Sequence, residues 1–226
     1  MVVIEQLLSQ GEVNVYRQVL NELQWQDGGT TAKGMASSVK HNTQADPEDA
    51  NVRQLVNSLL ARMGETPELV SAALPQHIFP PCFNRYERQQ QYGFHVDAAI
   101  MRIPNSQTVM RSDLSMTLFL SDPKEYEGGE LIITTEFGEQ AVKLQAGDAV
   151  LYPSSSLHKV TQVTKGVRLA AITWIQSMVA DVSLRQSLYQ LDRTIQVLMQ
   201  NDTINRAELD SLHNVYHNLI RQNAQI

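Results

Sequence analysis

The triplet His95-Val96-Asp97 carries two side chains that can bind a metal ion. On a β-strand, residues two apart point to the same side, so this imidazole and this carboxylate can face one interior point. Both groups are suitable ligands for Fe(II). The triplet alone is weak evidence, because a chain with six histidines and 24 acidic residues can contain it by chance, and an isolated one is more often structural.

A triad of two histidines and one carboxylate needs its second histidine from a distant strand, because one strand supplies only two of the three directions. His158 is the natural donor, since it opens an expected strand directly after the loop at residues 152–156. The alternative is a hydrogen-bonded histidine of the core or the rim. The prediction is therefore one metal site formed by His95, Asp97 and His158.

Arg168 lies ten residues beyond His158, in an otherwise apolar stretch with the character of a strand. A buried guanidinium is costly unless it meets a carboxylate. An aspartate or glutamate of the protein itself is one candidate partner. A bound dicarboxylate is the other, because the planar guanidinium can hold a carboxylate through two hydrogen bonds.

The composition limits the remaining classes of function. Of the 226 residues 42% are hydrophobic, and 24 acidic against 18 basic residues give a net charge of −6, which argues against a general nucleic-acid binder. The only cysteine, Cys82, excludes an internal disulfide and a four-cysteine zinc site. The sequence shows no run of about 18 apolar residues and no basic start followed by an apolar stretch, so we expect a cytoplasmic protein.

The first 75 residues are predicted to be helical. Residues 16–23 place apolar side chains on one helical face. A second helix is expected to begin at Asp46 and end at Gly64, and a third to open at Thr66-Pro67. The apolar stripe of the second helix consists of Val52, Leu55, Val56, Leu59, Leu60 and Met63.

From residue 76 the pattern changes to short strands. Residues 114–121 alternate between leucine or methionine and other side chains, a period of two that is typical of a strand. Many short strands separated by turn clusters indicate a sandwich, barrel or jelly roll rather than a parallel sheet. Further strands are expected at residues 131–135, 141–144, 149–152, 158–163 and 167–175.

The last 48 residues return to helical spacing and predict a hairpin of two helices. A break at Asn201-Asp202 separates them, with Asp202 or Thr203 as the expected cap of the second helix. Both helices carry an apolar stripe that has to be buried against the barrel or against a second copy of the chain. We therefore expect residues 180–222 to mediate homodimerisation. The second stripe consists of Leu209, Leu212, Val215, Tyr216, Leu219 and Ile220.

The ordered set His95-x-Asp97, His158 and Arg168 resembles the iron and 2-oxoglutarate signature of the double-stranded β-helix dioxygenases. It is most similar to the prolyl-4-hydroxylase-like branch, and within it to the PKHD-type (PiuC-like) bacterial hydroxylases. One departure is Thr31-Ala32-Lys33-Gly34, where the family leads us to expect a tighter Thr-Ala-Gly. The supporting motifs are Trp25-x-Asp27-Gly28, Lys40-x-Asn42, Arg111-Ser112-Asp113-Leu114-Ser115, Tyr126-x-Gly128-Gly129-Glu130-Leu131, Ala146-Gly147-Asp148, Tyr152-Pro153-Ser154 and Trp174-Ile175-Gln176-Ser177.

The resemblance implies the fold and its division. It implies a double-stranded β-helix, a cupin-like jelly roll of mainly β or α+β class, with N-terminal helices packed on it and a C-terminal helical hairpin. The dioxygenase domain would span residues 1–177, with its helices at 1–75 and its core at 76–177. The helical module would span residues 178–226.

The resemblance also implies the chemistry. His95, Asp97 and His158 would bind Fe(2+), and Arg168 would hold the distal carboxylate of 2-oxoglutarate. Tyr86 resembles a tyrosine that helps to hold this co-substrate, although it is equally well explained as a core or rim residue. Decarboxylation of 2-oxoglutarate to succinate would be coupled to hydroxylation of a substrate by O₂, with L-ascorbate as a reductant. Asp97 favours hydroxylation, since related halogenases lack this carboxylate.

Several other residues have both a functional and a structural interpretation. Lys40 and Asn42 could reach a substrate, or the lysine could be solvated. Trp174 could line the pocket or belong to the core. His213 and His217 have a metal-ligand spacing on a helix, but Asn214 stands where a zinc protease has glutamate, so a polar-face or interface role is expected. The remaining residues of this kind are Gly128-Gly129, read as a turn, Glu130, read as a solvated or structural partner, and His41 and His77, which show no second ligand nearby.

Two other functions compete with the hydroxylase. One is a non-catalytic cupin-like sensor of a metal or a small acid, linked to iron homeostasis. The other is an interaction protein whose working surface is the C-terminal hairpin. Three intact ligands together with Arg168 favour the enzyme, because a sensor has no need of a co-substrate anchor. The sequence does not identify the substrate, which could be a small molecule or a peptidyl group. Analogy with bacterial iron acquisition suggests a siderophore-related molecule or an iron-uptake protein. We expect loops near residues 30–45 and 100–112 to determine the choice of substrate.

Overall fold

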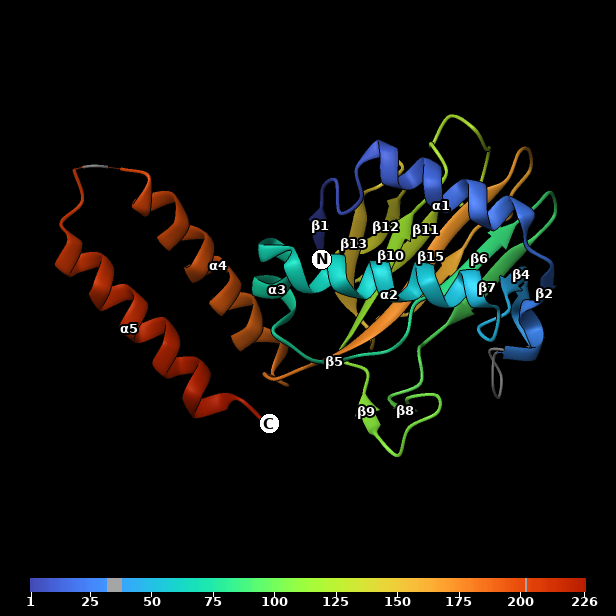
Figure 1. Ribbon diagram of the computed structural model, residues 1–226. Coiled ribbons are helices and arrows are strands. Elements are labelled where there is room, and N and C mark those ends of the chain that lie inside the picture. The colour runs from blue at the N-terminus through green and yellow to red at the C-terminus, as the bar shows by residue number, and fades with distance from the viewer. Residues whose placement is uncertain (32–37, 202) are drawn as a thin grey trace.

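A computed structural model describes residues 1–31, 38–201 and 203–226 as two facing β-sheets, helices that cover the outer side of one sheet, and a helical hairpin to one side (Figure 1). All strand pairs among the described residues are antiparallel. This arrangement confirms the predicted jelly-roll core, which is preceded and followed by helices along the chain.

The larger sheet has the order β1-β13-β10-β15-β6-β4-β2, and β5 pairs with β15 as well. The smaller sheet has the order β12-β11-β14-β7-β3, and β8 and β9 form a separate two-stranded sheet. The strands of the larger sheet are β1 (Val2–Ile4), β2 (Trp25–Asp27), β4 (Thr43–Ala45), β5 (Pro75–Ile78), β6 (Cys82–Tyr86), β10 (Leu114–Phe119), β13 (Ala149–Pro153) and β15 (Arg168–Ser177). The others are β3 (Lys40–His41), β7 (Gln91–His95), β8 (Ile100–Arg102), β9 (Val109–Arg111), β11 (Leu131–Thr135), β12 (Gly138–Val142) and β14 (His158–Val160).

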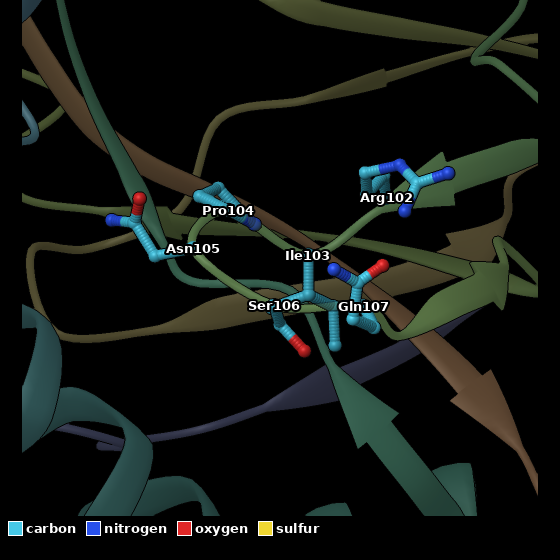
Figure 2. A pocket seen from close by; sticks show the side chains of 6 residues that line it. All are labelled: Arg102, Ile103, Pro104, Asn105, Ser106 and Gln107. Atoms are coloured by element: carbon cyan, nitrogen blue, oxygen red, sulfur yellow. The ribbon is translucent and has the colours of Figure 1, made fainter.

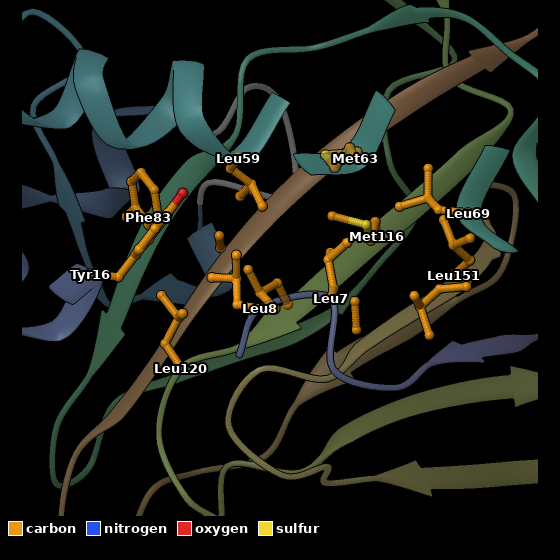
Figure 3. Packing of buried hydrophobic residues seen from close by; sticks show 14 of the residues in the cluster. Leu7, Leu8, Tyr16, Leu59, Met63, Leu69, Phe83, Met116, Leu120 and Leu151 are labelled. Atoms are coloured by element: carbon orange, nitrogen blue, oxygen red, sulfur yellow. The ribbon is translucent and has the colours of Figure 1, made fainter. Parts of the chain in front are cut away.

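The helices α1 (Gln10–Glu22), α2 (Ala50–Glu65) and α3 (Pro67–Ala73) provide one half of the main core. Their apolar faces pack against the outer face of the larger sheet, as Figure 3 shows. The other face of that sheet points toward the smaller sheet, so all six residues of β10 are buried. The outer-face cluster includes Tyr16, Leu20, Leu55, Leu59, Met63, Phe83, Met116, Leu118, Leu151 and Leu169. The cluster between the sheets consists of Tyr86, Phe119, Leu131, Ile133, Val142, Val150, Tyr152, Val160 and Val163.

The N-terminal region is less helical than predicted. The strands β1, β2 and β4 join the larger sheet and β3 joins the smaller one, and the short 3-10 helix η1 (Gly28–Thr31) follows β2. Strands of two or three residues are too short to show an alternating pattern, so the sequence gives no sign of them. Asp49 rather than Asp46 caps α2, accepting hydrogen bonds from the backbone of the first turn, and α2 continues through Gly64 to Glu65.

Two strand boundaries also differ from the prediction. β12 begins at Gly138 rather than residue 141, because Gly138 closes the tight turn that joins it to β11. β14 ends at Val160 rather than residue 163, because residues 161–163 leave the ladder and bond to neighbouring loops instead. The expected strands at 149–152 and 167–175 match β13 and β15 to within two residues.

The helical hairpin consists of α4 (Val182–Met199) and α5 (Arg206–Asn223) and has its own small core. This core contains Leu188, Ile195 and Tyr216 together with Leu74 and Val179 of the barrel side. The predicted cap of α5 is wrong: Asn205 caps it, Thr203 lies before it, and Asp202 lies outside the described residues. Val215 of the second stripe is 52% exposed, so the hairpin's own core does not cover this side chain.

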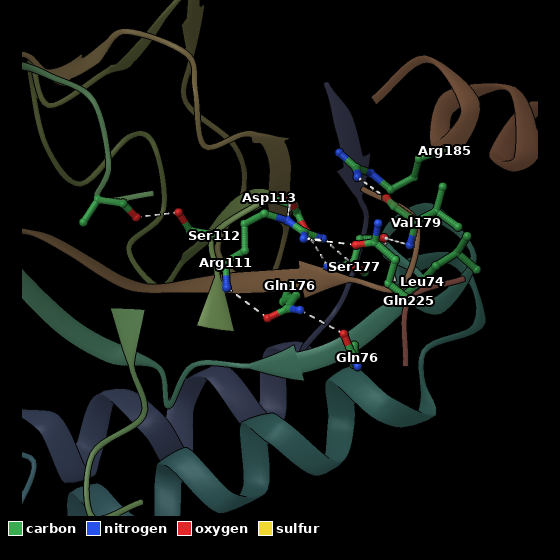
Figure 4. Close-up of polar contacts among 11 residues, drawn as sticks. Leu74, Gln76, Arg111, Ser112, Asp113, Gln176, Ser177, Val179, Arg185 and Gln225 are labelled. Carbon is green, nitrogen blue, oxygen red and sulfur yellow. Dashed lines mark hydrogen bonds and ion pairs between the residues drawn. The ribbon is translucent and has the colours of Figure 1, made fainter. Parts of the chain in front are cut away.

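A polar network joins the barrel to this hairpin (Figure 4). The Arg111 guanidinium donates to both carboxylate oxygens of Asp113, to the Ser177 carbonyl and to Gln225 after α5. Arg185 of α4 is buried and donates from Nη1 to the Val179 carbonyl at 2.7 Å.

Among the described residues, no helix is long and apolar enough to cross a membrane.

Candidate metal and co-substrate site

Two adjacent strands of the smaller sheet bring the predicted histidines together. β14 pairs with β7 so that His158 lies directly opposite His95. Asp97 lies two residues past the end of β7, so the expectation that it belongs to the strand is wrong, although its side chain still faces both histidines. One potential ligand atom from each of the three residues lies within 4.8 Å of the others. The predicted triad is thus assembled in space.

The backbone fixes the orientation of both imidazole rings. Nδ1 of His95 is 2.8 Å from the Gly93 carbonyl, and Nδ1 of His158 is 2.9 Å from the Ser156 carbonyl. A carbonyl oxygen only accepts, so each Nδ1 must carry the proton, and each Nε2 is left with a lone pair. These Nε2 atoms lie 3.9 and 3.7 Å from the two carboxylate oxygens of Asp97. This tautomer and this convergence are what a metal site requires.

Asp97 is held by serines that belong to the family motifs but have no role predicted from them. The Ser115 hydroxyl donates to Oδ2 of Asp97 at 2.6 Å, and it also bonds to the Ser154 hydroxyl at 2.8 Å. The Ser112 hydroxyl donates to the Ala98 carbonyl at 2.5 Å, which ties down the segment after Asp97 (Figure 4). The family motif contains Ser115 but gives it no role; the pairing of β10 with β13 and β15 places it at the site.

Arg168 is the first residue of β15 and lies opposite Tyr86 of β6. The Arg168 side chain is 1% exposed, and its guanidinium carbon lies 5.2 Å from the Tyr86 ring and 5.4 Å from the Phe119 ring. No carboxylate of the described residues lies within 4.0 Å of this guanidinium, so the described chain provides no internal ion pair. Its Nε is buried without a hydrogen-bond partner among the described residues. An anion that enters from outside would satisfy this charge.

Arg168 and the triad share one interior. Tyr86 belongs to the cluster between the sheets, as do Tyr152 and, packed against it, Tyr92. The Tyr152 ring lies 5.2 Å from the His158 ring, and the Tyr92 ring stacks on His95 at 3.6 Å between centroids. One cluster of side chains between the sheets therefore adjoins both the three potential ligands and the buried guanidinium.

Comparison with known families supports this geometry. Residues 81–176 match the 2OG-Fe(II) oxygenase superfamily, and residues 183–225 match the PKHD-type hydroxylase C-terminal domain. A PKHD-type hydroxylase from Shewanella frigidimarina is 68% identical over 100% of both chains, and one from Acinetobacter baumannii strain AYE is 44% identical over 99% of this chain and 98% of that one. The chain belongs to the PKHD-type hydroxylase family of 2OG-Fe(II) oxygenases. The hydroxylase is thus an oxidoreductase that uses Fe(II) and 2-oxoglutarate to hydroxylate a substrate, as the motifs predicted.

Solved structures show the same fold for the hydroxylase. A prolyl-4-hydroxylase from Pseudomonas putida superimposes with a TM-score of 0.54 at 19% identity, covering 77% of this chain and 91% of that chain. HygX from Streptomyces hygroscopicus, solved with nickel, 2-oxoglutarate and hygromycin B bound, has a TM-score of 0.51 at 15% identity, covering 79% of this chain and 83% of that chain. The jelly roll is therefore shared with these proteins.

Lys40 and Asn42 of the hydroxylase are buried rather than solvated. Lys40 Nζ donates to the Gln44 side chain at 3.3 Å and lies 5.6 Å from the Tyr92 ring, while Asn42 donates to Asn84. Burial lowers the pKa of Lys40. Lys40 lies where β3 meets β7, whereas Asn42 follows β3 and contacts β6. The neighbouring departure at 32–34 lies outside the described residues.

The remaining candidates have structural surroundings. Trp174 is half-buried, lies opposite Ser115 and packs edge-on against Phe79. It is six residues from Arg168 on β15, so the two side chains share one face of the sheet. Glu130 accepts from Thr161, which confirms a structural partner. In the described chain, the triad is the only group of three or more potential metal ligands. The rings of His213 and His217 stack with their centroids 6.3 Å apart, and Nδ1 of His213 lies 3.1 Å from the Leu209 carbonyl. Of the two isolated histidines, His41 is exposed and His77 half-buried.

The hairpin β8–β9 begins three residues after Asp97 and projects from the barrel (Figure 1). Its tip surrounds an open hollow of about 520 Å³ (Figure 2). Ile100 and Val109 on this hairpin are 62% and 50% exposed. The hollow is lined by Arg102, Ile103, Pro104, Asn105, Ser106 and Gln107, within the region predicted to choose the substrate.

The metal-free hydroxylase is expected to lose stability in mild acid because of His95. Burial and, secondarily, the charge of His158 lower the pKa of His95 from 6.5 to about 4. Below pH 6.5 the unfolded chain therefore binds more protons than the folded one, so the free energy of unfolding falls as pH drops from 6.5 toward 4. Thermal unfolding in EDTA at pH 7 and pH 5 measures this change. His95→Gln should show a smaller decrease, and an equal decrease in both proteins would contradict the assignment to His95.

Cys82 of the hydroxylase is expected to react slowly with alkylating reagents. Burial raises the pKa of its thiol to about 11, so only about 0.001 of it is thiolate at pH 8, against about 0.2 for an ordinary thiol. Alkylation by iodoacetamide at pH 8 should therefore be about two hundredfold slower in the folded protein than in urea. Mass spectrometry of timed samples measures both rates, and comparable rates would refute the prediction.

Proposed function

We propose that His95, Asp97 and His158 hold Fe(II), and that Arg168 with Tyr86 receives the distal carboxylate of 2-oxoglutarate. The proposal rests on two features that lie between the two sheets. Three potential ligand atoms lie within 4.8 Å of one another, and a buried guanidinium has no internal ion pair among the described residues. The donor set suits Fe(II), because it combines two neutral imidazoles and one carboxylate and leaves positions open.

The residues have separate tasks in this proposal. The Gly93 and Ser156 carbonyls keep the two Nε2 atoms free for the metal, and Ser115 keeps Asp97 turned toward it. Tyr86 and Phe119 exclude water from the guanidinium, which strengthens its attraction for a carboxylate. When bound, Fe(II) and 2-oxoglutarate supply the oxidising power that hydroxylates a C–H bond at the expense of O₂ and releases succinate and CO₂.

The substrate class, the reductant and the location are also proposed. We infer a small-molecule or peptidyl substrate, in line with a prolyl-4-hydroxylase and an enzyme crystallised with hygromycin B among the structural neighbours. L-ascorbate would keep the iron reduced, and the cytoplasm would be the compartment. Residues 1–177 would form the dioxygenase domain and residues 178–226 the helical module.

An anaerobic titration tests the proposed site. Fe(II) and 2-oxoglutarate added together should produce a weak visible charge-transfer band, which neither produces alone. A folded, iron-loaded sample without this band would speak for the non-catalytic sensor. Succinate release measured against a panel of metabolites and peptides would then identify the substrate class.

We also propose that the C-terminal hairpin mediates homodimerisation. Val197 and Met199 of α4 are 65% and 52% exposed, and Val215 of α5 is 52% exposed beside an open hollow at the start of that helix. A second copy of the chain would cover these side chains.

Light scattering is expected to show a dimer for the intact chain and a monomer for residues 1–177. Val215→Glu should also give a monomer, because a charge at this exposed position would have to be buried in the interface. The control Val15→Glu changes an exposed valine on α1 and should leave the dimer intact. A truncated chain with unchanged oligomeric state and good solubility would refute the dimer proposal.

A further inference from the structure

Two loops interlock at the end of the barrel where Arg168 begins its strand. The backbone of Glu127 donates to the Lys165 carbonyl and accepts from Thr164, both at 2.9 Å. Gly128 has a φ of +73°, and a Cβ there would lie 2.0 Å from the Gln162 carbonyl oxygen. The loop that carries Tyr126 is therefore fixed against the segment that leads into Arg168.

Gly129 shows how closely Tyr126 and Arg168 lie together. A Cβ at Gly129 would be 3.0 Å from Cδ of Arg168 and 3.0 Å from Cε2 of Tyr126. Nζ of Lys143 donates to the Tyr126 backbone carbonyl at 2.9 Å and lies 4.0 Å from the centroid of the tyrosine ring. These contacts place the ring beside the guanidinium and fix it there.

The polar atoms of this pair have no acceptor. The Tyr126 hydroxyl and Nε of Arg168 are both buried without a hydrogen-bond partner among the described residues. Tyr126 is 2% exposed and Arg168 1% exposed. A buried donor without an acceptor is costly, and two of them side by side indicate a site for a bound acceptor. Burial raises the pKa of Tyr126, against smaller opposing effects of the Arg168 charge and of direct contact with the Arg168 side chain, so the hydroxyl keeps its proton at neutral pH.

We propose that the Tyr126 hydroxyl and the Nε edge of Arg168 together bind the distal carboxylate of 2-oxoglutarate. This inference rests on the proposed function and adds a residue that neither the sequence motifs nor the family comparisons assign to the co-substrate. One carboxylate oxygen accepts from the guanidinium and the other from the phenol. The loop contacts hold both donors in place before the co-substrate arrives, so little conformational freedom is lost on binding.

Calorimetric titration of the intact protein loaded with Mn(II) tests the proposal with two ligands. One is 2-oxoglutarate, and the other is 2-oxopentanoate, which lacks the distal carboxylate. Tyr126→Phe removes one hydrogen bond to a charged group, so 2-oxoglutarate should bind about tenfold more weakly. Affinity for 2-oxopentanoate should stay within twofold, because this ligand does not reach the hydroxyl.

Tyr189→Phe is the matched control, since it removes a tyrosine hydroxyl that donates to Glu68 at 2.8 Å far from the barrel interior. It should leave both affinities unchanged. Wild-type affinity of Tyr126→Phe for 2-oxoglutarate would overturn the role of Tyr126 alone. A wild-type protein that does not bind 2-oxoglutarate, or binds 2-oxopentanoate equally well, would instead overturn the proposed function and this inference with it.

Discussion

Asp97→Ala is expected to lower the affinity for Fe(II) by more than about a hundredfold and to abolish succinate formation. Asp97 supplies the only negative charge of the triad, and its two oxygens face the Nε2 atoms of His95 and His158 at 3.9 and 3.7 Å. Without it, two neutral imidazoles remain, a weaker site for a divalent ion. Anaerobic titration with Fe(II) measures the affinity, and the charge-transfer band with 2-oxoglutarate should disappear.

Ser115→Ala gives a graded test of the same site. It removes the hydroxyl that donates to Asp97 at 2.6 Å and leaves all three ligands in place. Loss of such a supporting contact typically weakens metal binding by about 10–100-fold. Glu139→Ala, at an exposed carboxylate on β12, is the control and should bind Fe(II) normally. If Asp97→Ala binds Fe(II) as tightly as the natural chain, the metal lies elsewhere.

The residues that carry the chemistry were predictable from the sequence because their types are rare in apolar strands. Arg168 stood out from an otherwise apolar segment, and His158 followed a loop at the start of a strand. What the sequence could not provide was the pairing between strands: His158 lies opposite His95 because β14 joins β7, a contact between residues 63 positions apart. The serine that holds Asp97 and the tyrosine beside Arg168 depend on such pairings in the same way.

Errors in the predicted elements also have a physical cause. Helices such as α2 bury one stripe of side chains and leave the rest exposed, so the spacing of their apolar residues predicts them from the sequence. The strands β1 to β4 have two or three residues each and are stabilised by their neighbours in the sheets. Their formation is decided by contacts such as those of β1 with β13, which no local pattern encodes.

Arg168→Met is expected to have opposite effects on co-substrate binding and on the stability of the unliganded protein. The charge-assisted pair with a carboxylate is worth about 3 kcal/mol or more, so affinity for 2-oxoglutarate should fall by at least about a hundredfold. The free energy of unfolding without ligand should instead rise by on the order of 1 kcal/mol. The reason is that an apolar side chain of similar length replaces a buried charge that has no internal ion pair among the described residues.

Thermal unfolding with and without 2-oxoglutarate, at a fixed concentration of Mn(II), separates the two effects. The natural chain should gain stability from the ligand by mass action, whereas Arg168→Met should start higher and gain almost nothing. Arg185→Met is the matched control, since Arg185 is also buried with an unpartnered Nη2 but lies at the junction with the C-terminal hairpin. It should leave the gain from 2-oxoglutarate intact. An equal gain in Arg168→Met and the natural chain would mean that the buried guanidinium does not contact the co-substrate. Another buried cation would then have to bind the distal carboxylate. Lys40 would be the first candidate, because its ammonium is buried and lies above the Tyr92 ring that stacks on His95.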